Sequence, residues 1–314
     1  MWNPYQDTDS LMLAFMNGYY GAAAPYLYQE QKIMEGALLA SGKELWIYDS
    51  PITHKDGMLN ANLRKIYNEL FDKAEAAVKN DPERLKHVQI SRLSLQYSEL
   101  EIARTESAQN KEDITKKLEL FHARTQQFGV KTLNERNNAP EEYCQLYRQR
   151  FLPQEKQNLA LGAKVTYVSL PDEKYQPISG TALTDGLYGG TTYVESWVGW
   201  CGRDAEFIID LGEEKSFSQI SVDFLHQLGA WILLPKGGTF SVSRDGTNYQ
   251  SIGSFAFPED RDLQVKFVPG ECKLNTQVSA RYIKVYVNTI GMCPDWHYGV
   301  GYPAWFFLDE VNVY

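Results

Sequence analysis

The C-terminal half of the chain combines aromatic side chains with imidazole and charged groups. It holds five of the seven tryptophans. Flat aromatic rings stack on the C–H faces of sugars, and sugar hydroxyls need imidazole, amide or charged partners. The candidate ligand-binding residues, most of them in predicted loops, are Trp197, Trp200, Arg203, His226, Trp231, Trp296 and His297. They predict a glycan site. The alternative is that the tryptophans brace long loops, and Trp305, which leads into the last predicted strand, is assigned to the core.

The sequence contains few residue patterns that are typical of catalytic sites. A glycosidase needs two facing carboxyl groups, but the neighbours Asp309 and Glu310 would point to opposite faces of a strand, and Glu206, near Asp204, fits the start of an exposed strand. The sequence has no GxSxG elbow, phosphate loop or HExxH helix. We therefore predict no complete catalytic site in this chain.

Length and composition indicate a soluble globular protein of about two domains. Of the 314 residues, 43% are hydrophobic and 23% charged, and the net charge of -9 disfavours nucleic acid as a partner. No apolar run predicts a membrane-spanning segment, and the first residues lack the order of a signal peptide. Because the chain opens close to a predicted helix, we expect it to be a fragment of a longer protein.

The four cysteines show no CxxC spacing, which disfavours a structural zinc site. Cys201 and Cys293 both lie in aromatic loops and could pair in an oxidising compartment. The alternative is four reduced, partly buried thiols.

The elements that must position these residues change character along the chain. From Asp9 to about Arg150 the apolar residues recur with helical period. The breaks come at Asn80-Asp81-Pro82, at the N-cap Asn110 and at Phe128-Gly129. The predicted helices cover residues 10–17, 24–39, 59–77, 85–100 and 110–128. A helical bundle over residues 1–150 follows, with an aromatic loop at residues 46–51 that we expect to pack on the bundle or, alternatively, to close one side of a missing barrel or dock on the sandwich.

From Asn158 the pattern becomes one of short alternating runs. The predicted strands cover residues 206–211, 220–224, 239–243, 281–287 and 306–313. Asp210-Leu211-Gly212 and Asp245-Gly246 supply turn residues, and strands without intervening helices indicate an antiparallel β-sandwich. We predict a sandwich over residues 158–314 after a linker at 151–157, which makes the chain an α+β multidomain protein.

Several motifs of this half stand in the order found in discoidin domains. They are Asn158-Leu159-Ala160, Leu183-Thr184-Asp185-Gly186, Trp197, Ile208-Ile209-Asp210-Leu211-Gly212, Ser243-Arg244-Asp245-Gly246, Ala280-Arg281-Tyr282-Ile283-Lys284-Val285 and Phe307-Leu308-Asp309-Glu310-Val311. Residues 158–314 thus resemble discoidin domains, also called coagulation factor 5/8 C-type domains or carbohydrate-binding module family 32. More narrowly, Trp231, Pro235, Trp296-His297 and Trp305 resemble the variant appended to bacterial family 20 hexosaminidases and related glycosidases.

This resemblance implies a jelly roll that binds ligands through loops at one end and holds a structural calcium ion. Asp185 and Glu310 look like the calcium ligands of many discoidin domains, where loop carbonyls complete the shell, and Thr191 is a further candidate. Leu187-Tyr188-Gly189-Gly190 departs from the more common polar loop. The alternative is an ordinary Asp-Gly turn with Glu310 in a salt bridge.

The N-terminal half is similar to the helical tail of a domain of unknown function, number 4838, of large secreted proteins in gut Bacteroidetes-type bacteria. Residues 15–25 and the helix around Leu93 to Leu100 carry the similarity. It implies an exported protein, periplasmic, cell-surface or extracellular, whose catalytic barrel precedes this chain.

The combined prediction is an accessory fragment that binds the ends of glycans for an exported glycoside-hydrolase-like protein. In one alternative the sandwich stabilises the missing catalytic domain without binding sugar. In the other, the helical half completes a glycosidase active site.

Overall fold

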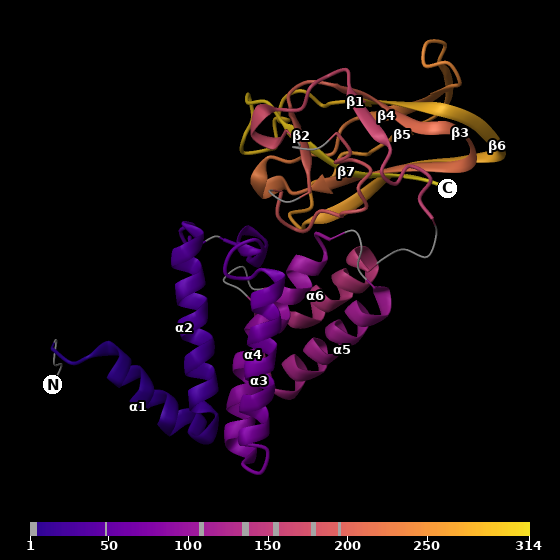
Figure 1. Cartoon of the computed structure of the whole chain (residues 1–314). Helices are drawn as coiled ribbons and strands as arrows, with labels where there is room; N and C mark the ends of the chain where they lie inside the picture. The colour runs from indigo at the N-terminus through magenta and orange to yellow at the C-terminus, as the bar shows by residue number, and fades with distance from the viewer. Residues whose placement is uncertain are drawn as a thin grey trace. The chain divides into compact units, whose positions relative to one another are not determined.

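The computed structural model describes residues 5–47, 49–106, 110–133, 138–152, 157–176, 180–193 and 196–314. The chain divides into two compact units, Met1–Pro153 and Gln154–Tyr314, the first helical and the second built of strands (Figure 1). This confirms the predicted fold class of helices followed by an antiparallel sandwich. Of the expected linker at 151–157, residues 153–156 lie outside the described residues. No described helix is long and apolar enough to cross a membrane.

The helical unit begins its helices where the sequence provides caps. Its helices are α1 (Thr8–Tyr20), α2 (Ala24–Ser41), α3 (Ala61–Ala77), α4 (Pro82–Ala103), α5 (Lys111–Gln127) and α6 (Pro140–Leu146), with short turns η1 (Gly21–Ala23), η2 (Pro51–His54) and η3 (Tyr147–Phe151). The side chains of Asn60, Asp81 and Asn110 each accept a hydrogen bond from a first-turn amide, which satisfies a donor that the helix itself leaves unpaired. The predicted break at Asn80-Asp81-Pro82 and the predicted N-cap at Asn110 are confirmed, and α4 begins three residues before the predicted range.

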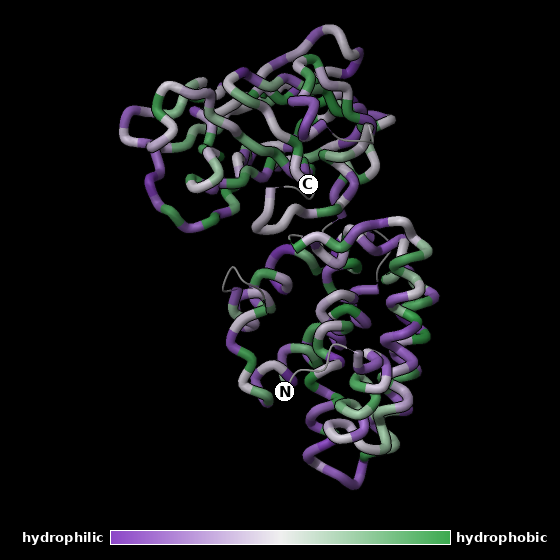
Figure 2. The backbone as a smooth tube through the Cα atoms, turned by 90° about the vertical axis from the view of Figure 1, so that its left-hand side faces the viewer, coloured by the Kyte–Doolittle hydropathy of each residue, from purple (hydrophilic) through white to green (hydrophobic). Residues whose placement is uncertain are grey.

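The helices bury one face each. Tyr67 and Phe71 of α3 pack in one apolar cluster, while Leu118 and Phe121 of α5 pack in another with Tyr147. The backbone tube alternates between hydrophobic and hydrophilic stretches along the helices, as one-sided burial requires (Figure 2).

Only part of the aromatic loop at residues 46–51 packs on the helical unit as expected, since Asp49 is half-buried and lies 3.1 Å from the buried His54 ring. Trp46 is 66% exposed and Ile47 is 75% exposed, so the expectation that they pack on the bundle is wrong. Tyr48 lies outside the described residues.

The second unit is an antiparallel sheet folded into a sandwich. Its strands are β1 (Lys164–Tyr167), β2 (Val198–Cys201), β3 (Ala205–His226), β4 (Gly237–Ser243), β5 (Gln250–Ala256), β6 (Lys266–Asn288) and β7 (Trp305–Val313), with short turns η4 (Glu173–Tyr175) and η5 (Leu228–Ala230). Their order is β2-β7-β3-β6-β4-β5, and β1 also pairs with β3. The first half of β3 pairs with β1, the second half pairs with β7, and β6 follows β3 along both halves, so one long strand takes part in both layers.

The prediction of two strands joined by a turn at Asp210-Leu211-Gly212 is wrong. β3 continues through this segment as an irregularity in its pairing with β6, where Gly212 takes a φ of 82° and its amide donates to the Asp210 carboxylate. The turn predicted at Asp245-Gly246 is confirmed, since it lies between β4 and β5 and Gly246 has a φ of 77°.

All four cysteines are free thiols in the structure. Cys201 and Cys293 are therefore reduced here, and burial raises the pKa of both thiols. A raised pKa keeps a thiol protonated and unreactive near neutral pH.

Candidate functional site

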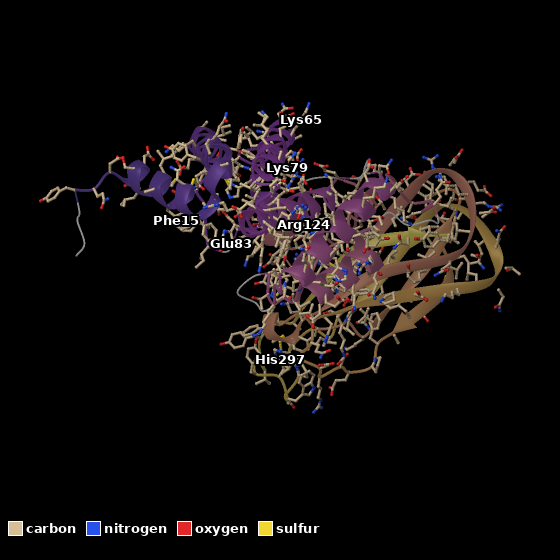
Figure 3. All side chains as sticks on the ribbon, turned by 90° about the horizontal axis from the view of Figure 1, so that it is seen from below. Phe15, Lys65, Lys79, Glu83, Arg124 and His297 are labelled. Atoms are coloured by element: carbon tan, nitrogen blue, oxygen red, sulfur yellow. The ribbon has the colours of Figure 1, made fainter. Side chains whose placement is uncertain are left out.

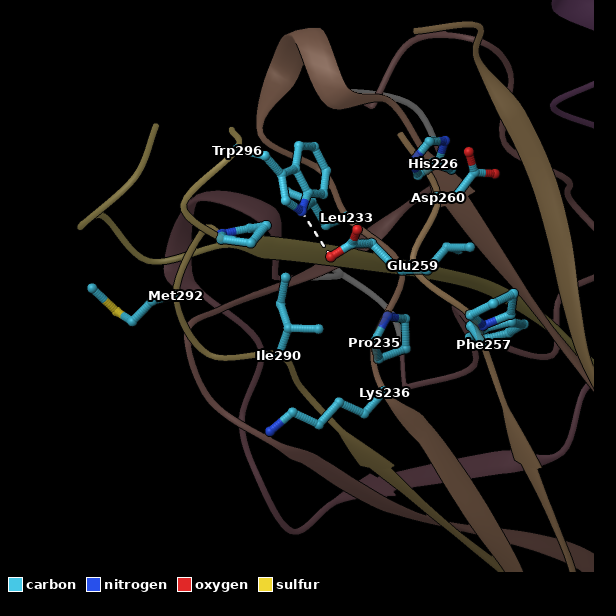
Figure 4. A pocket seen from close by; sticks show the side chains of 13 residues that line it. His226, Leu233, Pro235, Lys236, Phe257, Glu259, Asp260, Ile290, Met292 and Trp296 are labelled. Carbon is cyan, nitrogen blue, oxygen red and sulfur yellow. Dashed lines mark hydrogen bonds between the residues drawn. The ribbon is translucent and has the colours of Figure 1, made fainter. Parts of the chain in front are cut away.

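A pocket of about 280 Å³ opens among the segments that follow β3, β5 and β6 (Figure 4). Leu233 and Pro235, between β3 and β4, are buried in its lining. Phe257, after β5, and Ile290, after β6, are half-buried and line it as well. The lining is therefore mostly apolar and comes from segments far apart in the sequence.

Trp296 lies at the edge of this pocket and is held there by two charged residues. Its indole Nε1 donates to Glu259 Oε2 at 2.7 Å, the contact dashed in Figure 4. The Arg261 guanidinium lies 4.9 Å from the centre of the indole ring and donates to Glu259 Oε1 at 2.7 Å. The hydrogen bonds from Trp296 and Arg261 lower the pKa of Glu259, so this carboxylate is ionised near neutral pH.

His226 is the polar group of the pocket lining that the protein leaves unsatisfied. The residue is 1% exposed, and neither ring nitrogen makes a hydrogen bond of standard geometry among the described residues. A backbone group of Asp260 lies close enough to the ring to favour its protonated form. Burial lowers the pKa of the imidazole, and the nearby Asp260 opposes this effect. A neutral imidazole has one donor and one acceptor, and burying both without partners costs free energy. A group entering the pocket can supply what is missing.

His297 is equally buried but fully satisfied, and it does not line the pocket. Its Nε2 lies 3.1 Å from the Leu228 carbonyl, and its Nδ1 accepts from the Gly299 amide at 3.0 Å. Because a carbonyl only accepts and an amide only donates, these contacts fix the proton on Nε2. Figure 3 labels His297 among the loops of the sandwich. This histidine ties loops together, as does Trp231, whose ring packs 5.4 Å from that of Tyr302.

Two of the other predicted tryptophans are structural in their contacts. Trp200 lies in β2 rather than in a loop, is fully buried, and stacks 5.6 Å from Phe306, so its loop assignment is wrong. It is drawn into the core because β2 pairs with β7. Trp197 is buried, and its Nε1 donates to the Gly190 carbonyl at 3.0 Å.

Arg203 is exposed and is not among the residues that line the pocket. Trp305, assigned to the core, is half-buried and packs edge-on against Tyr175 at 5.2 Å. The pocket thus brings together two of the seven predicted residues, His226 and Trp296.

The sequence analysis missed the residues that hold Trp296. Glu259 and Arg261 come from the charged segment after β5, whose loop composition is visible in the sequence. Nothing in that composition indicates that this loop reaches the Trp296 indole.

Asp185 and Glu310 form a second, separate site of interest. Glu310, on β7, is fully buried; its Oε1 accepts from the Gly186 amide at 3.0 Å, and its Oε2 has no hydrogen-bond partner among the described residues. Burial, together with the neighbouring carboxyls of Asp309 and Asp185, raises the pKa of Glu310 to about 10. Burial also raises the pKa of Asp185.

These carboxyl groups fit a hard cation such as Ca²⁺, which binds carboxylate and carbonyl oxygens. The structure brings Asp185 and Glu310 together, as the calcium prediction requires, and Thr191 lies half-buried six residues further along the same loop. No cluster of three or more His, Cys, Asp or Glu side chains surrounds a metal position in the described part of the chain, so backbone carbonyls would supply the remaining ligands.

Residues 165–306 match the family of F5/8 type C domains. Together with the antiparallel sandwich, this match establishes an F5/8 type C, or discoidin, domain in the C-terminal unit, as the motifs predicted. No curated protein sequence matches the chain.

Solved structures similar to the chain include carbohydrate-binding modules. CBM32-1 from a family 31 glycoside hydrolase of Clostridium perfringens is 18% identical, over 51% of this chain and 99% of its own, with a TM-score of 0.36. CpGH89CBM32-5 of the same organism, in complex with GalNAc-β-1,3-galactose, is 20% identical over 50% of this chain and 99% of its own, with a TM-score of 0.33. A Ruminococcus gnavus GH29 fucosidase in complex with fucose is 17% identical, with a TM-score of 0.34; the match covers 56% of this chain but 30% of the fucosidase.

Proposed function

We propose that the C-terminal domain binds the end of a glycan in the pocket beside Trp296. The observation that carries the proposal is His226, a buried imidazole in the pocket lining with neither nitrogen paired among the described residues. Leaving such a group unpaired is costly, and a ligand that pairs with it removes the cost. The indole of Trp296 adds a flat apolar wall at the pocket edge.

The affinity of such a site is weak. A pocket of about 280 Å³ encloses little more than one sugar residue, so only a small surface is buried on binding. We expect dissociation constants on the order of 0.1 to 1 mM. This range suits a module that acts beside another domain of the same protein.

The test is a titration of the whole chain, labelled with ¹⁵N in its tryptophans, with galactose, glucose and their N-acetylated amino counterparts. The Trp296 indole resonance, assigned from a Trp296→Phe sample, should move on addition of at least one sugar. The resonances of the buried Trp197 and Trp200 serve as internal controls. If no sugar moves the Trp296 resonance at tens of millimolar, glycan binding in this pocket is refuted.

We also propose a structural calcium ion held by Asp185, Glu310 and loop carbonyls, with Thr191 as a candidate ligand. The support is the buried Glu310 carboxyl, whose Oε2 has no hydrogen-bond partner among the described residues. Bound Ca²⁺ would supply positive charge to the buried carboxylates and act as a staple between the loop and β7.

At the level of the whole protein we propose an exported glycoside-hydrolase-like parent in which this chain is an accessory fragment. The support is the F5/8 type C domain. The resemblance of residues 15–25 and of the helix around Leu93 to the tail of domain 4838 is a further motive, which rests on the sequence motifs alone. The rival in which the sandwich only stabilises a catalytic domain gains weight from Trp231 and His297, whose contacts brace loops. The titration separates these two readings, whereas an active site completed by the helical half would require mutations there to reduce catalysis by the parent protein.

A further inference from the structure

Trp296 differs from two buried tryptophans of the same domain in the group that its indole N–H meets. Trp197 and Trp200 donate to the backbone carbonyls of Gly190 and Ser169, whose positions the main chain fixes. Trp296 donates instead to a side-chain carboxylate 37 residues away in the sequence, on the loop after β5 (Figure 4). The orientation of this indole therefore depends on a side chain of another loop.

The backbone that carries Glu259 is held in place without the help of Trp296. The next residue, Asp260, accepts hydrogen bonds from Lys266 Nζ at 2.7 Å and from the amide of Asp262 at 2.9 Å. Lys266 is the first residue of β6, so these contacts tie the loop to the sheet. The Glu259 carboxylate is thus presented from a braced segment.

Arg261 completes the arrangement from the same segment. Its guanidinium donates to Oε1 of Glu259 at 2.7 Å, while Oε2 accepts from the Trp296 indole. A carboxylate whose two oxygens both accept hydrogen bonds has little freedom to turn, and charge-assisted bonds are among the stronger ones. The guanidinium also lies over one face of the indole ring, 4.9 Å from its centre, which leaves the other face for a ligand.

These contacts contribute little to the stability of the fold. The side chains of Arg261 and Glu259 are 62% and 52% exposed, and ion pairs between exposed side chains stabilise a protein only slightly. Their effect falls on the indole, which could otherwise turn about its side-chain bonds. A side chain that must be ordered at the moment of binding weakens affinity.

We propose that Glu259 and Arg261 are positioning residues that set the Trp296 indole in place before a glycan binds. This inference rests on the proposed glycan binding in the same pocket and concerns how the aromatic wall of that pocket is prepared. The two side chains act through the indole and need not touch the sugar. Preorganisation of this kind raises affinity without adding a contact.

The first test is made without sugar, on the whole chain labelled with ¹⁵N in its tryptophans. Glu259→Ala removes the acceptor of the indole N–H, so the Trp296 indole resonance should move and its proton should exchange with water several-fold faster. The matched control is Arg244→Ala, which removes an exposed arginine that pairs with Glu214 at 3.3 Å outside the pocket lining, and it should change neither. An indole resonance and exchange rate unchanged by Glu259→Ala would show that the carboxylate does not hold the ring.

The second test is the affinity of the same variants for the sugar that the wild-type protein binds best. Glu259→Ala and Arg261→Ala should each weaken binding by about three- to tenfold, while Arg261→Lys, which keeps a cation beside the carboxylate, should restore most of the loss. Arg244→Ala should keep the wild-type affinity, and urea unfolding should give equal stabilities for all these variants.

The outcomes of this titration separate the inference from the proposed function. Unchanged affinity in Glu259→Ala, in a protein whose indole has been released, would overturn the positioning role and leave glycan binding standing. If no sugar binds the wild-type protein, both are refuted.

A double-mutant cycle shows whether the carboxylate acts through the indole. Trp296→Phe has no ring N–H to hold, so adding Glu259→Ala to it should weaken binding no further. The methyl resonance of Met292, which lines the pocket, follows binding in both backgrounds. If Glu259→Ala weakens binding equally with and without the indole, the carboxylate acts on the sugar directly and the inference is wrong.

Discussion

His226 and His297 lie in two regions of the same domain and are buried to nearly the same extent, yet one is unsatisfied and the other is complete. Both ring nitrogens of His297 have hydrogen-bond partners within the protein, a backbone carbonyl and a backbone amide. The pocket around His226 does not. Residue type and burial are the same in the two regions, so the difference that indicates function is the number of hydrogen-bond partners the protein supplies.

The largest expected effect is the difference in the free energy of unfolding between two single variants, in which one or the other histidine is replaced by leucine. His297→Leu leaves the Leu228 carbonyl and the Gly299 amide buried without a partner, and we expect it to lower the free energy of unfolding by about 2–4 kcal/mol. His226→Leu removes an unsatisfied polar group and should leave that free energy unchanged or raise it. Urea unfolding of the two variants measures both. Equal destabilisation would show that His226 has a structural partner and would break the comparison.

A third region sharpens the comparison, because its unsatisfied groups are carboxyls. Burial raises the pKa of Asp185 and, with Asp309 and Asp185 nearby, that of Glu310 from 4.5 to about 10, so the folded metal-free protein holds protons that the unfolded chain has released. Its free energy of unfolding should be greatest below about pH 4.5 and should fall as the pH rises toward 10. Thermal melting without metal, from acid to alkaline pH, measures this slope.

Bound calcium should offset the loss of stability that comes from ionising these buried carboxyl groups. At neutral pH, Ca²⁺ at about a hundred times its dissociation constant stabilises the folded state by about 2.7 kcal/mol and raises the melting temperature. Asp185→Asn should erase this response, while Asp245→Asn, in a turn between β4 and β5, should retain it. Melting curves that coincide in calcium and in chelator would count against the ion.

The two half-buried indoles of the loops should separate binding from stability. Trp296→Ala removes a wall of the pocket and should weaken sugar binding by about 1–3 kcal/mol. The free energy of unfolding should change little. Trp231→Ala removes packing against Tyr302 and should instead lower stability by about 1–3 kcal/mol while sugar still binds. The measurements are sugar titration and urea unfolding. Loss of binding in a stable Trp231→Ala protein would place that loop in the site.

The smallest effect is the pH dependence of sugar binding. Burial lowers the pKa of His226, so the imidazole is neutral at pH 7 and loses its acceptor only when it is protonated in acid. Asp260 and Asp262 favour protonation and Lys266 opposes it. Affinity for a sugar in this pocket should stay constant above pH 6.5 and weaken below it, which titration at a series of pH values measures. Binding that strengthens in acid would contradict a neutral imidazole.

Much of the fold could be predicted because local chemistry decides it. Asn110 caps α5 through its own side chain, and the apolar period of α3 matches the face it buries. The strands β1 and β2 were missed because each has four residues, too few to show a period. The seven-residue strand β5 was missed because none of its residues is fully buried, which leaves its alternation weak. The sequence analysis divided β3 into two strands because Gly212 is typical of a turn, and the sequence alone does not show that it lies in an irregularity within one strand.

The site could be predicted only in part. His226 and Trp296 were predicted because their residue types suit a sugar, and both line the pocket. Trp200 and His297 were included for the same reason, and only the fold shows that one stacks in the core and the other is fully paired. Hydrogen-bond satisfaction depends on segments brought together from distant parts of the chain, and spacing along the sequence does not encode it.

The position of β7 also determines when this domain can form during synthesis. β7 lies between β2 and β3, and Val313 at its end accepts from the amide of Leu159 at 2.9 Å, so the strand made last joins the beginning of the domain to its centre. Neighbouring helices such as α3 and α4 pack on each other and can assemble while the chain is still being extended. The sandwich cannot be completed until β7 has left the ribosome, and until then the edges of β2 and β3 that face β7 stay unpaired. Until β7 has been synthesised, rapid synthesis of the rest of the domain, or a chaperone, is needed to keep those edges from pairing with other chains.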